Sequence, residues 1–332
     1  MKMKKVLITG ASGFIGGFLV EEAISRGLTV HSALRNSSNT EVLDGLDTKL
    51  IYWDFENVDN MANILRKGDY DYIIHNAGLT KAKAKEAYFK VNEQYLRNLV
   101  DAIRMADLKL DKFLFVSSLA AFGPADFQPE NIVKENSVPH PVTNYGRSKL
   151  AAELYLIKQQ DIPHNIIRPT AVYGPREYDL LTVYQSLGKH IEAYIGLTNQ
   201  RLTFIYVKDL VRAMIDILFS DHEYKGYFIS DGHTYSAQEM NVIVKRELKV
   251  KWTIPIKLPI LLIKFLAFCN EKIANISGKY PPLNIEKVNE LQARDWNCDI
   301  SGLEKDISFV AEYNLDHGLK ETIIWCKEQE LV

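Results

Sequence analysis

The sequence has few cysteines and no excess of charge of either sign. Its three cysteines, Cys269, Cys298 and Cys326, lie far apart and match no metal-binding spacing. They are typical of reduced thiols in a cytoplasmic protein. The 40 basic and 42 acidic residues nearly balance, so we expect no overall field that would recruit nucleic acid or an anionic membrane. A small-molecule substrate is the partner that this composition favours.

We expect neither a signal peptide nor a membrane span. The start, MKMKKVLITG, runs directly into a strand-like segment and a glycine turn, which predicts a cytoplasmic location. The most apolar C-terminal stretch, 254–276, is interrupted by Lys257 and Lys264, so it falls short of the roughly 18 uncharged residues that a span requires. We expect it to form a helix of the core or substrate pocket; attachment to a membrane surface is the alternative.

Metal-binding patterns are missing as well. His75 and His140 occur without an HExxH motif or a paired carboxylate spacing, so structural roles are expected for both, and no metal site is predicted.

The first half of the sequence contains short apolar runs that alternate with helical patterns. Strands are expected at 6–10, 29–34, 49–55, 70–77 and 112–118, with helices at 14–26 and 86–106 between them. Strands that are apolar throughout and separated by helices predict a parallel sheet covered on both faces. The fold class is therefore α/β, a doubly wound (Rossmann) parallel sheet.

The second half divides less regularly. A buried-strand pattern at 164–174 follows the helix from Tyr145, and 204–232 again reads as strand, helix and strand. We expect a dinucleotide-binding domain over 1–174, with 204–232 returning to its sheet. Residues 175–203 and 233–332 are then expected to form a smaller substrate-binding region.

A glycine turn follows the first expected strand. In TGASGFIG, Gly10, Gly13 and Gly16 let the backbone approach a pyrophosphate and let the helix pack on the strand. The spacing is GxxGxxG, which departs from the dinucleotide fingerprint GxGxxG. We expect backbone groups at Ser12, Phe14 and Ile15 to bind the cofactor together with these glycines.

The end of the second strand predicts NADP more strongly than NAD. An NAD enzyme usually places a carboxylate there, whereas this chain has Arg35 followed by Asn36, Ser37 and Ser38. A guanidinium suits the 2'-phosphate of NADP, although NAD remains possible. Asp54 is a candidate for the adenine amino group, or simply a loop residue, and the backbone at Asn76, Ala77 and Gly78 is expected to let the dinucleotide pass.

Tyr145 and Lys149 lie four residues apart in YGRSK, on one face of an expected helix. An ammonium close to a phenol favours the phenolate, so the pair can act as an acid and base near neutral pH. Ser118 ends the strand KFLFVSS, where ligands bind in such folds. Its hydroxyl can hold the reacting oxygen while Tyr145 transfers the proton.

These residues resemble the extended short-chain dehydrogenase/reductase superfamily, which includes the NAD-dependent epimerase/dehydratase family. The motifs that carry the resemblance span most of the chain: TGASGFIG, WDF, HNAGLT, VNEQYLRNLVDA, FVSSLAAFG, YGRSK, RPTAVYGP, FIYVKDLVRA and RDWNCDISGLEKDISF.

The resemblance implies that Ser118, Tyr145 and Lys149 are catalytic and that Lys149 also binds the nicotinamide ribose. It further implies that the segment from Pro169 to Val172 contacts the carboxamide and that the protein is a homodimer. By the same motifs, Phe55, Thr80 and Asn92 are implied to bind the cofactor.

Three functions remain open. Leu119, Ala120 and Ala121 stand where the similar nucleotide-sugar dehydratases place an acidic pair. The apolar C-terminal part resembles 3β-hydroxysteroid dehydrogenases and dihydroflavonol reductases, which favours interconversion of a secondary alcohol and a ketone on a hydrophobic substrate. A nucleotide-sugar epimerase is the main alternative, and a non-catalytic NADP-sensing protein is the third.

Overall fold

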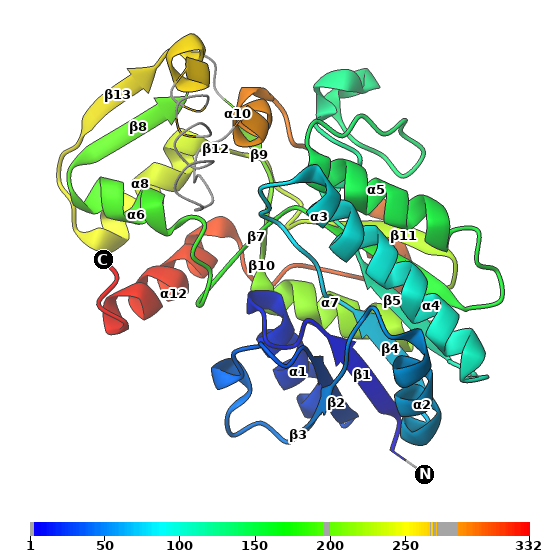
Figure 1. Cartoon of the computed structure of the whole chain (residues 1–332). Coiled ribbons are helices and arrows are strands. Elements are labelled where there is room, and N and C mark those ends of the chain that lie inside the picture. Colours follow the sequence, from blue (N-terminus) through cyan, green and yellow to red (C-terminus); the bar gives the residue numbers. More distant parts are fainter. Residues whose placement is uncertain (1–2, 196–199, 266, 268–269, 271–284) are drawn as a thin grey trace.

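A computed structural model describes residues 3–195, 200–265, 267, 270 and 285–332. Seven parallel strands form one sheet in the order β11-β6-β5-β4-β1-β2-β3 (Figure 1). The strands are β1 (Lys5–Thr9), β2 (Thr29–Leu34), β3 (Thr48–Tyr52), β4 (Tyr72–His75), β5 (Lys112–Val116), β6 (His164–Pro169) and β11 (Lys225–Ile229). The doubly wound α/β fold is confirmed.

Helices cover both faces of the sheet because the strands are apolar on both sides. Val6 and Ile8 of β1 pack toward α1 (Phe14–Ser25) and α7 (Val207–Phe219), whereas Leu7 packs toward the opposite helices. The opposite layer comprises α2 (Val58–Gly68), α4 (Tyr95–Met105) and α5 (Asn144–Leu156). Side chains alternate between the faces of a strand, so continuous apolar runs supply two separate cores.

The strand order reverses direction between β1 and β4, which are neighbours in the sheet. From β1 the chain winds outward to β2 and β3, then returns to β4 and continues through β5 and β6. Ligands of such sheets bind outside the carboxyl ends of the strands at this reversal. The glycine turn after β1 and the Asn76–Gly78 segment after β4 therefore lie side by side, and Ser118 follows on the next strand.

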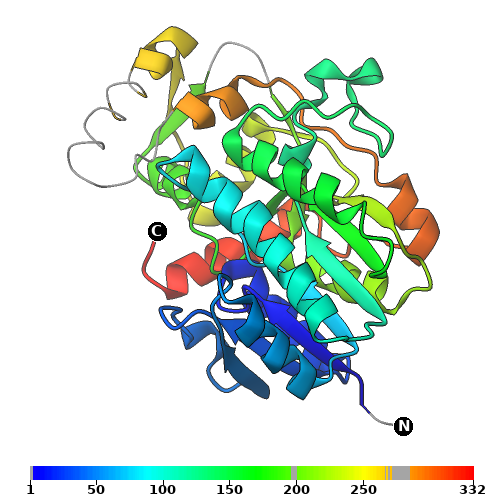
Figure 2. The ribbon, with the colours of Figure 1, turned by 45° about the vertical axis from the view of Figure 1, so that its right-hand side comes forward.

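A smaller assembly lies beyond the sheet's carboxyl edge. Strands β8 (Ile191–Ile195) and β13 (Ile254–Leu258) pair in parallel beside α6 (Leu181–Gly188) and α8 (Ala237–Leu248) (Figure 2). The C-terminal helix α12 (Leu315–Glu328) packs on α8, with Leu319 and Ile323 buried in a third core. Short pairs join the two parts: β7 (Ala171–Tyr173) with β10 (Phe204–Tyr206), and β9 (Arg201–Leu202) with β12 (Tyr235–Ser236). The domain boundaries at single residues stay a prediction.

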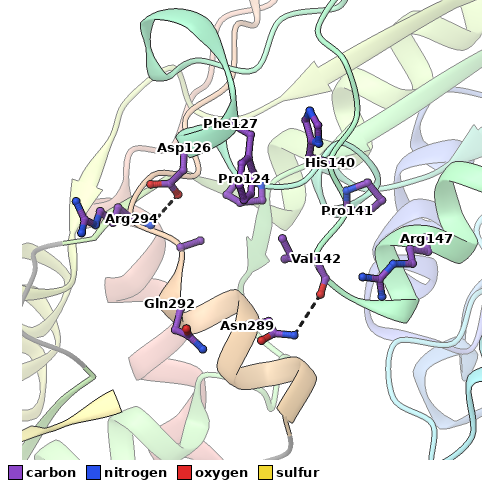
Figure 3. A pocket seen from close by; sticks show the side chains of 11 residues that line it. Pro124, Asp126, Phe127, His140, Pro141, Val142, Arg147, Asn289, Gln292 and Arg294 are labelled. Atoms are coloured by element: carbon purple, nitrogen blue, oxygen red, sulfur yellow. Dashed lines mark hydrogen bonds between the residues drawn. The ribbon is translucent and has the colours of Figure 1, made fainter. Parts of the chain in front are cut away.

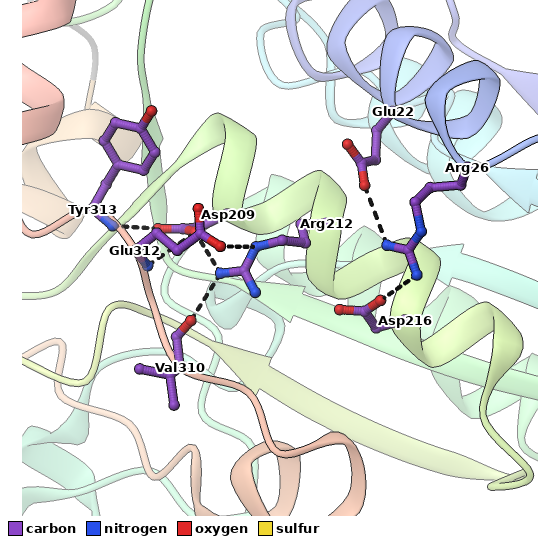
Figure 4. A network of polar contacts seen from close by, with 8 residues as sticks. All are labelled: Glu22, Arg26, Asp209, Arg212, Asp216, Val310, Glu312 and Tyr313. Carbon is purple, nitrogen blue, oxygen red and sulfur yellow. Dashed lines mark hydrogen bonds and ion pairs between the residues drawn. The ribbon is translucent and has the colours of Figure 1, made fainter.

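Asp209 fastens the C-terminal part to the sheet. Buried in α7, it accepts hydrogen bonds from the backbone N–H groups of Glu312 (3.1 Å) and Tyr313 (2.8 Å), and pairs with Arg212 (2.7 Å; Figure 4). Two turns further along α7, Asp216 binds Arg26 of α1 at 2.8 Å (Figure 4). The motif FIYVKDLVRA thus supplies an anchor for the chain that leads into α12.

The apolar segment 254–276 differs from the expected helix. It begins as strand β13, because Ile254 and Ile256 are β-branched and Pro255, which lacks an N–H group, is tolerated at a sheet edge. Residues 260–265 are helical, and residues 266, 268–269 and 271–276 lie outside the described part of the chain. Within that described part, no helix has the length and apolar character needed to cross a membrane.

Candidate active site

Ser118, Tyr145 and Lys149 come together at the carboxyl end of β5. Ser118 is the second residue after this strand, and its hydroxyl lies close enough to the Tyr145 phenol to lower the pKa of that group. Tyr145 occupies the first turn of α5, where Thr143 caps the helix by accepting a hydrogen bond from the Gly146 N–H at 3.0 Å. The contact between Ser118 and Tyr145 is the geometry that the proposed proton chemistry needs.

Lys149 lies one turn further along α5 and is buried. Its Nζ donates to the Val116 carbonyl oxygen at 2.7 Å and lies 5.0 Å from the centre of the Phe115 ring. A Cβ at Gly78 would approach this Nζ to 3.1 Å. Lys149 therefore reaches from α5 to the ends of both β5 and β4. Burial lowers the pKa of Lys149 to about 8, so the side chain is mostly protonated at neutral pH.

The phenol of Tyr145 is less acidic than the sequence suggested. Burial raises the pKa of Tyr145 to about 12; the hydrogen bond from Ser118 opposes this and the nearby Glu290 carboxylate adds to it. Lys149 is not among these causes, because its Nζ is directed to Val116 and Gly78. The expectation of a phenol made acidic by Lys149 is corrected in the chain without cofactor: Tyr145 holds its proton.

Asn92 has a positioning role in this structure. It is fully buried in a π-helical turn, Lys90–Gln94, between α3 (Lys85–Phe89) and α4. Its Oδ1 accepts from the Leu79 N–H at 2.7 Å, and its Nδ2 donates to the Leu79 oxygen at 3.0 Å and to Ser148 Oγ at 2.9 Å. These bonds occupy the amide and hold the loop after β4 against α5, so direct cofactor contact by Asn92 remains a prediction.

The glycine turn fits a bound phosphate. Gly10 has φ +68°, and a Cβ there would lie 2.7 Å from Ala77 N, while a Cβ at Gly16 would lie 2.0 Å from the Gly10 oxygen. Gly13 caps α1 without a side-chain hydrogen bond, and no acidic residue occurs in the first turn. The Gly13 N–H donates to the Gly10 oxygen at 3.1 Å, and no acidic side chain offsets the helix dipole at this end, which favours an anion here.

Neighbouring residues reinforce the same edge. Thr9 Oγ1 accepts from the Ala77 N–H at 3.1 Å and pairs with His75 Nδ1 at 2.9 Å, while Asn76 Nδ2 donates to the Gly10 oxygen at 3.3 Å. His75 is thus a buried structural side chain.

The other predicted cofactor residues lie along this edge with varied exposure. Arg35 and Asp54 are exposed after β2 and β3, and Phe55 is buried and stacked on Tyr95 with ring centres 5.0 Å apart. The side chain of Arg35 forms no ion pair with any described residue, whereas Asp54 accepts from the Glu56 N–H at 2.9 Å. The remaining candidates also lie near this edge: Ser12, Phe14 and Ile15 are partly buried at the start of α1, Thr80 is exposed after β4, Pro169 ends β6 and Val172 lies in β7.

The sequence reasoning missed Gly146. A Cβ at this position would lie 2.2 Å from the Ala120 oxygen, so only glycine lets α5 approach the turn Leu119–Ala121 after Ser118. The signal was present in YGRSK as the residue after the tyrosine.

A buried ion pair behind Lys149 was also missed. Arg168 Nη2 binds Glu153 Oε2 at 2.8 Å, and Ser117 donates to the same carboxylate. The Arg168 guanidinium lies over Phe122, 4.5 Å from the ring centre. Glu153 follows Lys149 by four residues, a spacing that predicts contact on a helix, and it raises the pKa of Lys149 against the effect of burial.

Helix α10 (Ile285–Gln292) adds two carboxylates beside the start of α5. Glu286 Oε1 accepts from the Asn144 N–H at 2.7 Å, and the Glu290 carboxylate contributes to the raised pKa of Tyr145. The distant segment that carries α10 therefore forms part of the surroundings of Tyr145.

A hollow of about 510 Å³ lies next to this site but does not include Ser118, Tyr145 or Lys149 (Figure 3). Its lining comes from three segments: Pro124, Asp126, Phe127, His140, Pro141 and Val142; Arg147; and Asn289, Gln292, Ala293 and Arg294. Because the catalytic candidates are absent from its wall, we assign it no part in the chemistry.

The proline-rich segment 124–141 beside this hollow is tied to the C-terminal part. Asp126 Oδ2 accepts from Arg294 N–H at 2.8 Å, and Val133 N–H donates to the Asn297 oxygen at 3.0 Å. Opening this segment as a lid would break these bonds.

Comparison with known proteins places the chain in a family. The model of the NAD dependent epimerase/dehydratase family matches residues 6–227. A ceramide reductase of Caulobacter vibrioides is 28% identical over 210 residues, which span 63% of this chain and 59% of that protein. A decarboxylating sterol-4-alpha-carboxylate 3-dehydrogenase of Candida albicans is 23% identical over 98% of both chains.

A solved structure shows the same fold over nearly the whole chain. The UDP-glucuronic acid 4-epimerase of Bacillus cereus, in complex with NAD, has a TM-score of 0.76 and 21% identity, covering 98% of this chain and 99% of that one. The family match indicates the same class of enzyme as the geometry does: a sheet with a reversal point, and Ser118, Tyr145 and Lys149 gathered beside it. This chain belongs to the NAD-dependent epimerase/dehydratase family and is an enzyme of the extended short-chain dehydrogenase/reductase type.

Proposed function

We propose that this enzyme is an NADP-dependent reductase that interconverts a ketone and a secondary alcohol on a hydrophobic substrate. The observation that carries the proposal is the placement of Ser118 beside Tyr145 at the end of β5, with the Lys149 ammonium one turn along the same helix. These groups meet at the carboxyl edge of the sheet, next to the glycine turn.

The three side chains divide the work of carbonyl reduction. A bound nicotinamide cofactor supplies the hydride to the carbonyl carbon. The Ser118 hydroxyl donates a hydrogen bond to the carbonyl oxygen, and Tyr145 gives that oxygen its proton. Because the pKa of Tyr145 is raised to about 12, the residue carries this proton at neutral pH. The phenolate that remains takes up a proton from solvent, and Lys149, whose Nζ lies between Val116 and Gly78, is positioned to bind the nicotinamide ribose.

Arg35 supports NADP as the preferred cofactor. Its exposed guanidinium comes after β2, has no described ion-pair partner and is accompanied by Ser37 and Ser38. A free guanidinium can bind the 2'-phosphate with two parallel hydrogen bonds.

Cofactor titrations test this preference. The wild type is expected to bind NADP more tightly than NAD, and Arg35→Ala is expected to lose NADP affinity by about tenfold or more, since charge-assisted hydrogen bonds contribute about 1.5–3 kcal/mol. Arg66→Ala, on the exposed end of α2, is the control. Equal affinities in the wild type, or unchanged NADP affinity in Arg35→Ala, would overturn the assignment.

The substrate class is supported by the turn after Ser118 and by the relatives. Leu119, Ala120 and Ala121 all have apolar side chains, so this turn supplies no carboxylate for elimination of water. The names of two relatives denote activity on a ceramide and on a sterol carboxylate. We propose a long-chain or polycyclic ketone as the substrate class.

Replacing the proton donor tests the mechanism. Tyr145→Phe is expected to lower kcat for NADPH-dependent ketone reduction by at least about 100-fold, with cofactor affinity kept. Tyr155→Phe, a partly buried tyrosine on the same helix, is the matched control. Full activity in Tyr145→Phe would remove Tyr145 from the reaction.

A nucleotide-sugar 4-epimerase is the second candidate function. It is supported by the fold shared with the UDP-glucuronic acid 4-epimerase, and the same serine, tyrosine and lysine would serve its proton transfers while a bound nicotinamide cofactor would accept the hydride and return it. Incubation with UDP- or GDP-sugars separates the two functions. Interconversion of sugar isomers without net use of NADPH would establish the epimerase and reject the reductase.

We further propose a homodimer formed through α4 and α5 and a cytoplasmic location. Exposed Met105, Leu154 and Ile157 lie on and next to these helices, which supports a second copy packing there. Light scattering of the wild type and of Leu154→Glu tests it; a monomeric wild type would contradict it.

A further inference from the structure

Strands β8 and β13 form a small sheet with one covered and one uncovered face. Ile254 pairs with Ile191 and Pro255 with Glu192. Glu192 is buried and contacts α8 through Asn241 (3.3 Å) and Lys245 (2.8 Å). Since paired residues of a parallel sheet point to the same side, Ile191, Ile254 and Ile256 point away from α8. Their side chains are exposed.

The helical residues 260–265 continue this apolar surface. Ile263 and Ala267 are buried against Val288 of α10. The inner side of this helix is therefore covered by α10. Leu261 and Phe265 on the outer side are 77% and 61% exposed. Trp252, just before β13, is 58% exposed and stacks on His190 at 4.1 Å.

The segment that carries most of this surface has charge of one sign. Residues 248–270 contain four lysines, Lys249, Lys251, Lys257 and Lys264, and no aspartate or glutamate. All four lysines are exposed, and no described acidic residue pairs with any of them. The nearest acidic side chain of the sheet, Glu192, is turned inward to Lys245. The chain as a whole is nearly neutral, but this segment is basic.

We propose that the surface formed by Ile191, Trp252, Ile254, Ile256, Leu261 and Phe265, bordered by the four exposed lysines of the same segment, binds the surface of an anionic lipid bilayer. Exposed apolar side chains can enter the boundary between headgroups and acyl chains while lysines remain at the headgroups. A second copy of this chain is a poorer occupant, because a two-fold interface would bring the same four lysines against each other. The surface lies at the end of the molecule opposite the N-terminus (Figures 1 and 2).

This location would suit a hydrophobic substrate. The helix that carries Leu261 and Phe265 packs on α10, and α10 in turn holds the start of α5 through Glu286 and Asn144. One helix thus separates the bilayer-binding surface from the helix that carries Tyr145. This link to substrate entry rests on the proposed reductase function; binding to the bilayer does not.

Vesicle sedimentation without substrate or cofactor tests the binding alone. The full-length protein is expected to sediment with vesicles of phosphatidylcholine and phosphatidylglycerol, weakly with phosphatidylcholine alone, and less as salt rises. The double variant Lys257→Gln/Lys264→Gln should bind the anionic vesicles roughly 30-fold more weakly, at about fivefold per lysine. Leu261→Glu/Phe265→Glu should show no measurable binding.

Matched controls exclude general effects. Lys67→Gln on α2 and Val310→Glu, 74% exposed near α7, change an exposed lysine and an exposed apolar residue elsewhere and should bind like the wild type. Unchanged thermal unfolding would show that the variants fold. Absence of wild-type binding to anionic vesicles, or undiminished binding by both double variants, would overturn the proposal. So would a dimer that Leu261→Glu/Phe265→Glu converts to a monomer. Because ketone reduction is assayed separately with a water-soluble substrate, failure of vesicle binding leaves the proposed reaction untouched.

Discussion

Burial of the Lys149 ammonium should make the stability of this enzyme depend on pH in a way that one substitution can isolate. Lys149 is 3% exposed, and its main polar contact is the Val116 carbonyl oxygen at 2.7 Å. Burial lowers its pKa from 10.5 to about 8. Lys149→Met keeps a linear side chain of similar volume and removes the titrating group.

The sign comes from proton counting. Between pH 8 and pH 10.5 the unfolded chain holds a proton on this lysine and the folded chain does not, so the free energy of unfolding rises with pH. The stability is fully present above the unfolded pKa and is lost as the pH falls through 8. Relative to Lys149→Met, the free energy of unfolding of the wild type should rise by about 2.5 kcal/mol from pH 7 to pH 10.

Urea unfolding of both proteins without cofactor, followed by tryptophan fluorescence at several pH values, measures this difference. Taking the difference cancels the titration of groups that both proteins share. Lys158→Met, which removes an exposed lysine just after α5, is the control and should stay within about 0.5 kcal/mol of the wild type. A difference between wild type and Lys149→Met that does not change with pH would refute the claim that burial penalises this ammonium.

Two further substitutions test how the site is held. Gly146→Ala would place a Cβ 2.2 Å from the Ala120 oxygen, so α5 must shift away from the turn after Ser118. We expect kcat to fall about 100-fold while NADP affinity changes little. An unchanged kcat would contradict the assigned close approach of α5 to this turn. Asp209→Asn weakens the pairing with Arg212 and the bonds from the N–H groups of Glu312 and Tyr313. We expect a loss of about 2 kcal/mol in the free energy of unfolding, measured by thermal or urea unfolding. Asp216→Asn, which alters a more exposed ion pair two turns along α7, is the control, and equal losses in both variants would show that Asp209 is no special anchor.

Local patterns in the sequence were sufficient for the central fold. Apolar runs separated by amphipathic helices predicted the parallel sheet, because a strand covered on both faces needs apolar side chains on both. The glycines at 10, 13 and 16 predicted the turn after β1, because their spacing serves a close backbone approach that larger residues block. The role of glycine at 146 was missed, because the oxygen it accommodates belongs to Ala120, which no local pattern connects to it.

The chemical state of the site required the tertiary structure. Four-residue spacing placed Tyr145 and Lys149 on one face of α5, but spacing carries no information about how deeply each side chain is buried or which groups from other segments it contacts. The structure directs Lys149 to Val116 and Gly78, and burial then raises the pKa of Tyr145 and lowers that of Lys149. Similarly, only the packing of Glu192 and Ile263 inward leaves the apolar side chains of 252–265 exposed among lysines that pair with no described carboxylate. The sequence by itself determined which residues could react and which strands would form the sheet, since both depend on neighbours along the chain. The tertiary structure decided protonation, positioning and surface exposure, because these depend on contacts between distant segments.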